Sequence, residues 1–220
     1  MKTPLLLLFA IFAVMNCTAC AETPPATFLI GSERIKVSPP FGFSECSKTT
    51  PFLSRYFAFL VLPNQFPLGG FLTDREVQFA STGAEPALWH VAFAYSMEEY
   101  RKETLRAADF AELRKHHRDN INKVVQVTED KSRKRFEEFG ASASGSLSSG
   151  GIFLDDASSF AFIAKSSGGA RAGINATAFV LVRGKIIGLS LGKVYSSDID
   201  IEWTKAAMKW WIDKLRSDNP

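Results

Sequence analysis

Short apolar or alternating segments, separated by turn residues, make up the part of the chain that follows residue 27. Apolar runs and polar–apolar alternation over about four to eight residues are typical of β-strands. This pattern predicts strands at residues 28–30, 34–37, 56–62 and 89–95. Residues 47–54 lack the pattern, and we expect a short helical or irregular turn there.

The middle of the chain has the three- and four-residue spacing of an amphipathic helix. Apolar residues recur at this spacing from Ala107, and Asp109 near the start complements the positive end of the helix dipole. A helix that continued to residue 139 would be about 50 Å long, which is too long for a domain of this size. We therefore expect a break around residues 120–128 and a second helix over residues 129–139.

The Gly- and Ser-rich residues 140–151 predict a flexible connector or a Gly-rich strand. A Walker phosphate-binding loop would need Gly-Lys-Ser/Thr after this run, and Ile152 follows instead. Beyond it we expect a strand at residues 159–164 and a hairpin in which residues 176–182 and 186–191 pair around Arg183-Gly184.

A closing helix is expected after Ser196-Ser197-Asp198, which can cap it. Its apolar residues recur in steps of four: Ile199, Trp203, Ala207, Trp211 and Leu215. We interpret this series as one apolar face that packs against the sheet, with Trp203 as a core residue.

The first residues have the pattern of a secretory signal peptide. Lys2 precedes an apolar run over residues 5–15, and small residues lead to Ala19-Cys20-Ala21. A membrane-spanning helix needs about 20 apolar residues, so this run is too short for an anchor. We expect residues 1–21 to be removed after Ala21, residues 22–27 to be a short leader, and the protein to be periplasmic or secreted.

A second interpretation of the same residues is processing as a bacterial lipoprotein. Cys17-Thr18-Ala19-Cys20 resembles the end of a lipobox, although Cys17 stands where Leu is usual. Lipidation of Cys20 would anchor the protein to a membrane. Only in that form do we expect a membrane association.

The composition is that of one soluble globular domain, for which we take residues 28–216. Hydrophobic residues are 46% and charged residues 22% of the 220. The 26 basic and 23 acidic residues leave a net charge of +3, which is too small to indicate nucleic acid as a partner. Three cysteines cannot form a disulfide framework.

Few titratable residues are candidates for catalysis. After removal of the signal peptide Cys46 is the only cysteine, and a lone cysteine is more often a small buried residue than a nucleophile. Glu112 and His116 would share a helical face, a geometry that can seed a metal site, but no further ligand spacing supports one. His90 and His117 lie in apolar patterns and are interpreted as structural. The sequence predicts no catalytic, cofactor-binding or metal-ligating residue.

Other charged clusters have ordinary interpretations. The acidic pairs are Glu98-Glu99, Glu137-Glu138 and Asp155-Asp156. Neighbouring carboxylates on a helix point about 100° apart, which does not suit a two-carboxylate hydrolase, and the last pair fits a turn. The basic residues Lys131, Arg133, Lys134 and Arg135 are flanked by acidic ones, which favours a solvated face. The glycosylation sequon at Asn175 is incidental if the signal peptide is bacterial.

The order of the elements carries a resemblance. Its landmarks are the Pro-Pro-x-Gly turn at residues 39–42, Ala108-Asp109-Phe110, the Val182-Arg183-Gly184-Lys185 hairpin and Tyr195-Ser196-Ser197-Asp198. Together they resemble a group of uncharacterised exported proteobacterial proteins and, more distantly, the PsbP-like/DcrB-like α/β/α sandwich. The resemblance covers most of residues 28–216. It implies an α+β fold with an antiparallel sheet flanked by helices, and an envelope location, but no catalytic residues.

These observations favour a non-enzymatic exported protein of the bacterial envelope that acts as a binding or accessory module, without a cofactor. Its partner would be an envelope or toxin protein. One alternative is a periplasmic hydrolase built around Cys46, His90 or the Glu112/His116 face. Another is an immunity-type protein that occupies the active site of a toxin. A deep polar pocket would favour the enzyme, and a broad exposed apolar patch the binding module.

The signal-peptide interpretation predicts that the exported protein begins at Glu22. Intact-mass measurement of protein from a bacterial envelope fraction tests this. A diacylglycerol-modified Cys20 terminus would establish the lipoprotein form instead, and an uncut Met1 would contradict both.

Overall fold

A seven-stranded antiparallel sheet organises the computed structural model, which describes residues 24–84, 86–138, 145–167 and 172–220. The strand order is β3 (Phe43–Glu45), β4 (Gln65–Thr73), β5 (His90–Met97), β9 (Lys185–Val194), β8 (Gly173–Val182), β7 (Ser159–Ser167) and β6 (Ser146–Asp156). A separate hairpin pairs β1 (Ala26–Ile30) with β2 (Glu33–Val37). The helices are α1 (Pro51–Leu60), α2 (Asp74–Ser81), the short 3₁₀ helix η1 (Glu98–Tyr100), α3 (Ala107–Asp119), α4 (Ile121–Glu138) and α5 (Asp198–Ser217).

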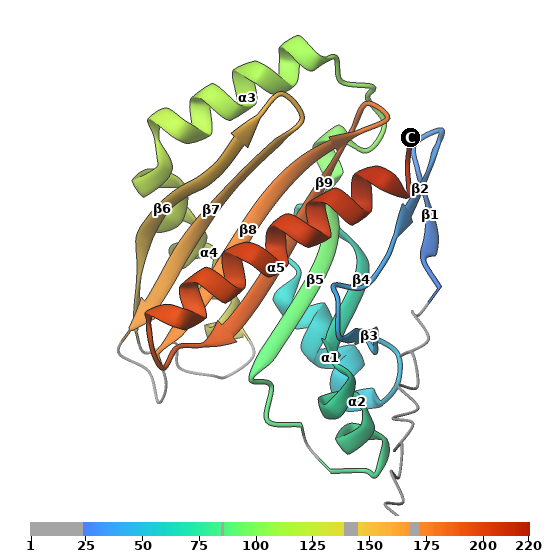
Figure 1. Ribbon diagram of the computed structural model, residues 1–220, viewed down its shortest axis with the longest axis vertical. Helices are drawn as coiled ribbons and strands as arrows, with labels where there is room; N and C mark the ends of the chain where they lie inside the picture. The colour runs from blue at the N-terminus through green and yellow to red at the C-terminus, as the bar shows by residue number, and fades with distance from the viewer. Residues whose placement is uncertain (1–23, 85, 139–144, 168–171) are drawn as a thin grey trace, which may run out of the picture.

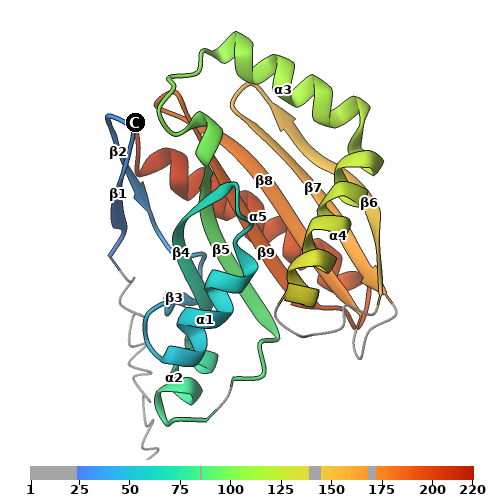
Figure 2. The same cartoon turned by 180° about the vertical axis from the view of Figure 1, so that it is seen from behind.

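Helices flank the sheet on both faces. On the first face α5 runs across β8 and β9, with the β1–β2 hairpin beside its C-terminal end (Figure 1). On the second face lie α1, α3 and α4 (Figure 2). The predicted α+β class, with an antiparallel sheet between helices, is therefore confirmed.

No helix of the described residues is long and apolar enough to cross a membrane. The expected signal peptide, residues 1–21, lies outside the described part of the chain.

Strand β9 determines what each face can bury, because its side chains alternate in size. Ile187, Leu189 and Leu191 point to the first face and join the core there with the buried side chains of α5. Between them stand Gly188, Ser190 and Gly192, which face the other way. Tyr95 of β5 lies over Gly188 so closely that a Cβ at that position would come within 2.3 Å of the ring.

The face of α5 that packs on the sheet differs from the predicted one. Its buried residues are Asp200, Thr204, Met208, Trp211, Ile212 and Leu215. Ile199 is 78% exposed and Trp203 is 37% exposed, so the prediction of Trp203 as a core residue is wrong. Steps of four residues advance about 400° around a helix with about 100° per residue, so the series rotates by about 40° at each step. The series that starts at Ile199 therefore turns onto the packed face only at its end, where Trp211 and Leu215 are buried.

The expected strand over residues 56–62 is also wrong, because most of that segment belongs to α1. The Thr50 hydroxyl accepts a hydrogen bond from the Leu53 amide at 3.2 Å, and Pro51 suits the first turn. Leu53 and Phe57 then become buried four residues apart. A short apolar run has no periodicity that separates a buried strand from a buried helix.

Other boundaries follow the predictions more closely. The helical break falls at Asn120, whose side chain donates a hydrogen bond to the His116 carbonyl, so α4 begins at Ile121 rather than near residue 129. The Gly-rich run is a strand from Ser146, while residues 139–144 lie outside the described part. At the β8–β9 turn both Arg183 and Gly184 have positive φ, as a tight hairpin requires.

Two neighbouring tryptophans of α5 test this packing. Trp211 is fully buried and its indole nitrogen donates to the Ser38 carbonyl at 2.7 Å, whereas Trp210 is 37% exposed. We expect Trp211→Ala to lower the free energy of unfolding by about 3–5 kcal/mol. Trp210→Ala, which removes an edge contact with the Phe41 ring, should lower it by less, about 1–2 kcal/mol. Urea denaturation measures both, and equal losses would contradict the observed orientation of α5.

Candidate functional site

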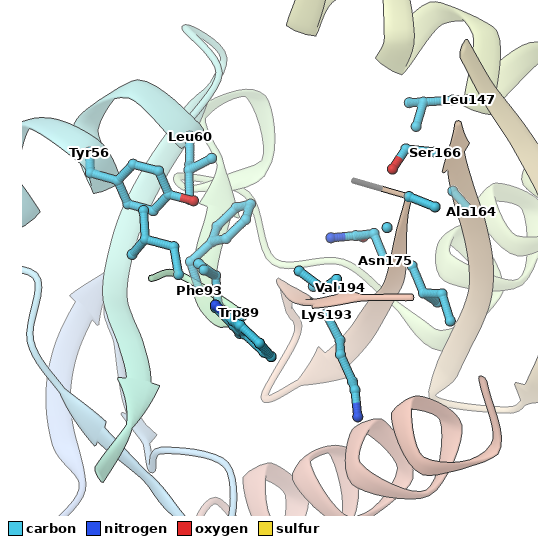
Figure 3. A pocket seen from close by; sticks show the side chains of 16 residues that line it. Tyr56, Leu60, Trp89, Phe93, Leu147, Ala164, Ser166, Asn175, Lys193 and Val194 are labelled. Carbon is cyan, nitrogen blue, oxygen red and sulfur yellow. The ribbon is translucent and has the colours of Figure 1, made fainter. Parts of the chain in front are cut away.

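A cleft remains on the second face because its helices pack over opposite sides of the sheet. Helix α1 buries Leu53 and Phe57 against β4 and β5. Helix α4 buries Val125 against Phe160 and Phe162 of β7. Between them, Gly192 of β9 and Gly173 of β8 have no side chains, which leaves this part of the face low. The resulting cavity has a volume of about 280 Å³ (Figure 3).

The two walls of this central cleft differ in character. One wall is aromatic (Figure 3). It consists of Tyr56 of α1, Trp89 directly before β5, and Phe93 of β5. Opposite it lie smaller side chains of β6 and β7, among them Leu147 and Ser166. The cleft thus presents aromatic rings on one side and small groups on the other.

Hydrogen bonds from helices on the second face fix both walls. The Glu76 carboxylate of α2 accepts a bond from the Trp89 amide at 2.7 Å and another from the Thr73 hydroxyl at 2.7 Å. On the other side the Glu129 carboxylate of α4 accepts from the Leu147 amide at 2.9 Å. In each wall a glutamate carboxylate from a helix therefore holds the backbone of the wall through an amide group.

The floor contains a small polar group made by β8 and β9. The Thr177 hydroxyl donates to the Asn175 carbonyl oxygen at 2.9 Å. The Asn175 amide nitrogen donates to the Ser190 hydroxyl at 2.9 Å. Asn175 and Thr177, the two ends of the sequon, thus point to the same face of β8 and orient each other. Gly192, beside Asn175 in the sheet, leaves the amide uncovered on that side.

The lining described by the structure presents no charge to the cleft. Lys193 is its one charged residue, and its ammonium lies 2.6 Å from the Asp200 carboxylate of α5. Figure 3 shows that this side chain points towards α5. Burial, together with the nearby Glu76 carboxylate, raises the pKa of Tyr56 to about 12, so the phenol stays neutral.

The structure does not bring the candidates Cys46 and His90 together. The Cys46 thiol is buried beneath α1 on the second face, 3.5 Å from the Gly70 carbonyl. Burial, with the Glu45 carboxylate, raises its pKa to about 12. The His90 ring lies instead 5.4 Å from the Trp203 ring of α5, and burial lowers the pKa of His90. Cys46 and His90 therefore belong to opposite sides of the sheet.

The histidines of α3 also have separate environments. Glu112 and His116 are exposed, while the His117 ring packs 5.1 Å from Phe179. The His117 Nδ1 lies 2.9 Å from the Leu113 carbonyl, and burial lowers the pKa of His117. His117 is thus the core-edge residue that the pattern predicted. In the described part of the chain, no group of three or more His, Cys, Asp or Glu residues is arranged to hold a metal ion.

The remaining charged clusters form ion pairs that connect elements or stabilise helices. Asp155 accepts from Arg114 and Arg118, which attaches α3 to β6. Asp156 pairs with Arg216 at 2.6 Å, which attaches the C-terminal end of α5 to the β6–β7 turn. In the basic run of α4, Arg133 pairs with Glu129, as expected for a solvated face. Arg135 differs from that expectation, because its half-buried guanidinium pairs with Glu138 and also donates to the Ala58 carbonyl of α1 at 3.4 Å. Glu98 pairs with Arg101 at 2.9 Å.

Sequence reasoning missed the residues that line the cleft. Tyr56, Trp89 and Phe93 fell in segments expected only to be strands, and Asn175 was interpreted as an incidental sequon. One usable signal was the alternation of β9, in which small residues at 188, 190 and 192 separate large apolar ones. Such a strand lacks large side chains on one face, and a hollow can form there.

Comparison with known proteins gives little further information. No protein-family model and no curated protein sequence matches the chain. A crystal structure of the Saccharomyces cerevisiae Ran-binding protein Mog1p is similar, with a TM-score of 0.37, 12% identity, and coverage of 88% of this chain and 89% of that chain. A point mutant of protein Mog1 gives a TM-score of 0.38 and 11% identity over 89% and 91% of the two chains. Likeness at this level carries no information on what this chain binds.

The environment of Cys46 predicts an inert thiol. With a pKa of about 12, roughly one molecule in ten thousand carries the thiolate at pH 8. In a chain that starts at Glu22 and contains this single cysteine, we expect native protein to react with Ellman's reagent less than about a hundredth as fast as free cysteine. The same protein unfolded in guanidinium should react stoichiometrically. A native rate close to that of free cysteine would contradict the burial of the thiol.

Proposed function

We propose that this chain is a non-enzymatic binding module of the bacterial envelope, and that the central cleft is its ligand site. The observation that carries the proposal is the cleft itself. It is a cavity of about 280 Å³, floored by hydrogen-bonded neutral side chains and walled by aromatic ones. Small-molecule sites are typically mostly apolar cavities of about 300–1,000 Å³ with a few placed polar groups, so this cavity suits a ligand at the small end of that range.

The hydrolase alternative has less support from the arrangement of its candidate residues. Nucleophilic hydrolysis needs a nucleophile and a base within hydrogen-bonding distance. Cys46 is buried beneath α1, His90 contacts α5, and the Glu112/His116 pair is exposed on α3. These groups stand on separate surfaces, and none of them lines the cleft.

The envelope location rests on the N-terminal sequence. Lys2, the apolar residues 5–15 and the small residues that end at Ala21 have the pattern of a signal peptide. An exported module with this cleft would bind its ligand outside the cytoplasm. Lipidation of Cys20 would place the same site at a membrane surface without changing the cleft.

Filling the cleft from its floor tests the proposal. A Cβ at Gly192 would meet its nearest neighbour, the Asn175 amide nitrogen, at an ordinary contact distance of 3.5 Å. Gly192→Val should therefore fold, with unfolding free energy within about 1 kcal/mol of the parent, while its methyl groups occupy the cleft. Ser148→Val, on the exposed part of β6, is the matched control.

The three proteins are screened by NMR against a mixed set of charged and uncharged fragments that includes esters. Fragments that shift the cleft amides of the parent and of Ser148→Val should bind Gly192→Val at least about tenfold more weakly. Equal binding to all three proteins, or no fragment that shifts the cleft amides, would contradict the proposal. Conversion of an ester fragment to its acid would point to the hydrolase instead.

A further inference from the structure

We infer that the central cleft takes an uncharged ligand that combines an aromatic ring with a hydrogen-bond acceptor such as a carbonyl group. This inference rests on the proposed function, because it specifies the chemistry of the same cleft. Three features carry it: the lack of an unengaged charge among the lining residues that the structure describes, the orientation of Asn175, and the contrast between the aromatic wall and the glycine floor.

Charge is the first feature. A charged ligand that leaves water for a partly enclosed apolar site needs an opposite charge or several donors to compensate for its lost hydration. The one ammonium of the lining, on Lys193, is engaged by the Asp200 carboxylate at 2.6 Å and lies 4.9 Å from the Trp203 ring. Tyr56 is neutral, since its pKa is raised to about 12. The described lining therefore presents no unengaged charge to an anion or a cation, and the nearby Glu76 carboxylate is occupied by the Trp89 amide and the Thr73 hydroxyl.

Asn175 supplies the polar contact. Its carbonyl oxygen is used by the Thr177 hydroxyl at 2.9 Å, and one amide hydrogen by the Ser190 hydroxyl at 2.9 Å. A side-chain amide has two N–H groups, so these bonds leave one donor in a fixed orientation. Figure 3 shows the Asn175 amide nitrogen directed across the cleft towards Phe93. A ligand that enters the cleft therefore meets a donor, and its matching group is an acceptor.

The shape of the cleft favours a flat ring. Tyr56, Trp89 and Phe93 offer ring edges and faces on one wall, and aromatic pairs in offset or edge-to-face geometry are favourable beyond simple burial. The floor at Gly173 and Gly192 has no side chains, so a ring can approach the sheet backbone closely. Trp89 is held by its backbone bond to Glu76 and is 50% exposed, so its ring is accessible at the cleft.

A matched pair of probes isolates the charge. Indole-3-acetamide and indole-3-acetate share one ring and nearly one shape, but only the first is uncharged at neutral pH. In NMR titrations of the full mature chain, we expect the amide to shift the Asn175 side-chain resonances and the Gly192 amide saturably. The acetate should bind at least about tenfold more weakly.

A variant of Asn175 isolates the donor. Asn175→Asp keeps an acceptor for the Thr177 hydroxyl but removes the amide hydrogens, and it should weaken binding of indole-3-acetamide about tenfold. Ser148→Asp adds the same charge on the exposed part of β6 and should leave binding unchanged. The thermal unfolding of both variants is recorded, and Asn175→Leu, which has nearly the same shape but no amide hydrogens, serves if Asn175→Asp fails to fold.

The outcomes separate this inference from the proposed function. If the acetate shifts the same residues as tightly as the amide, the ligand class is wrong although the cleft still binds. If Asn175→Asp, or Asn175→Leu in its place, leaves binding of the amide unchanged, Asn175 is not the polar contact and the inference is wrong. If neither probe shifts the cleft residues and the fragment screen also finds no binder there, both the inference and the proposed function are overturned.

Discussion

The alternation of large and small side chains along β9 is the constraint on which the architecture depends. Ile187, Leu189 and Leu191 give the first face a continuous apolar strip, and α5 covers it. On the second face Tyr95 packs over Gly188, while Gly192 leaves the strand uncovered beside Asn175. No helix need cross the centre of that face, because burial of apolar area is what holds a helix on a sheet. The core on one side and the cleft on the other thus follow from the same ten residues, Lys185–Val194.

Polar contacts then fix where α5 lies on this strip. At its start the Asp200 carboxylate pairs with Lys193 at 2.6 Å, and near its end Arg216 pairs with Asp156 at 2.6 Å. The partly exposed Arg216–Asp156 pair contributes at most about 1 kcal/mol, whereas truncating a buried tryptophan such as Trp211 costs about 3–5 kcal/mol. Apolar burial therefore stabilises the packing, and the ion pairs determine its position. The Lys193–Asp200 pair has a second consequence, because it withdraws the ammonium from the cleft.

The elements with strong local signals could be predicted from the sequence, and those that depend on tertiary contacts could not. The β8–β9 hairpin follows from Arg183-Gly184 and its flanking apolar runs. Strand β4 was missed because Pro67 and two glycines interrupt its pattern, although pairing with β5 across a bulge accommodates them. The alternation along β9 could indicate a hollow, but the residues that line the cleft could not be predicted, since it joins Tyr56 of α1 to Asn175 of β8. Only the packing of α1 over β5 brings these distant residues to one site.

The central claim is that the central cleft is a site for uncharged aromatic ligands. Intermolecular nuclear Overhauser effects between indole-3-acetamide and the isotope-labelled protein test this claim most directly. The account predicts contacts from the indole ring to the Tyr56 and Phe93 rings, and from the probe amide to the Asn175 side chain. Contacts confined to the exposed aromatic residues of the first face, Trp203 and Trp210, would contradict it.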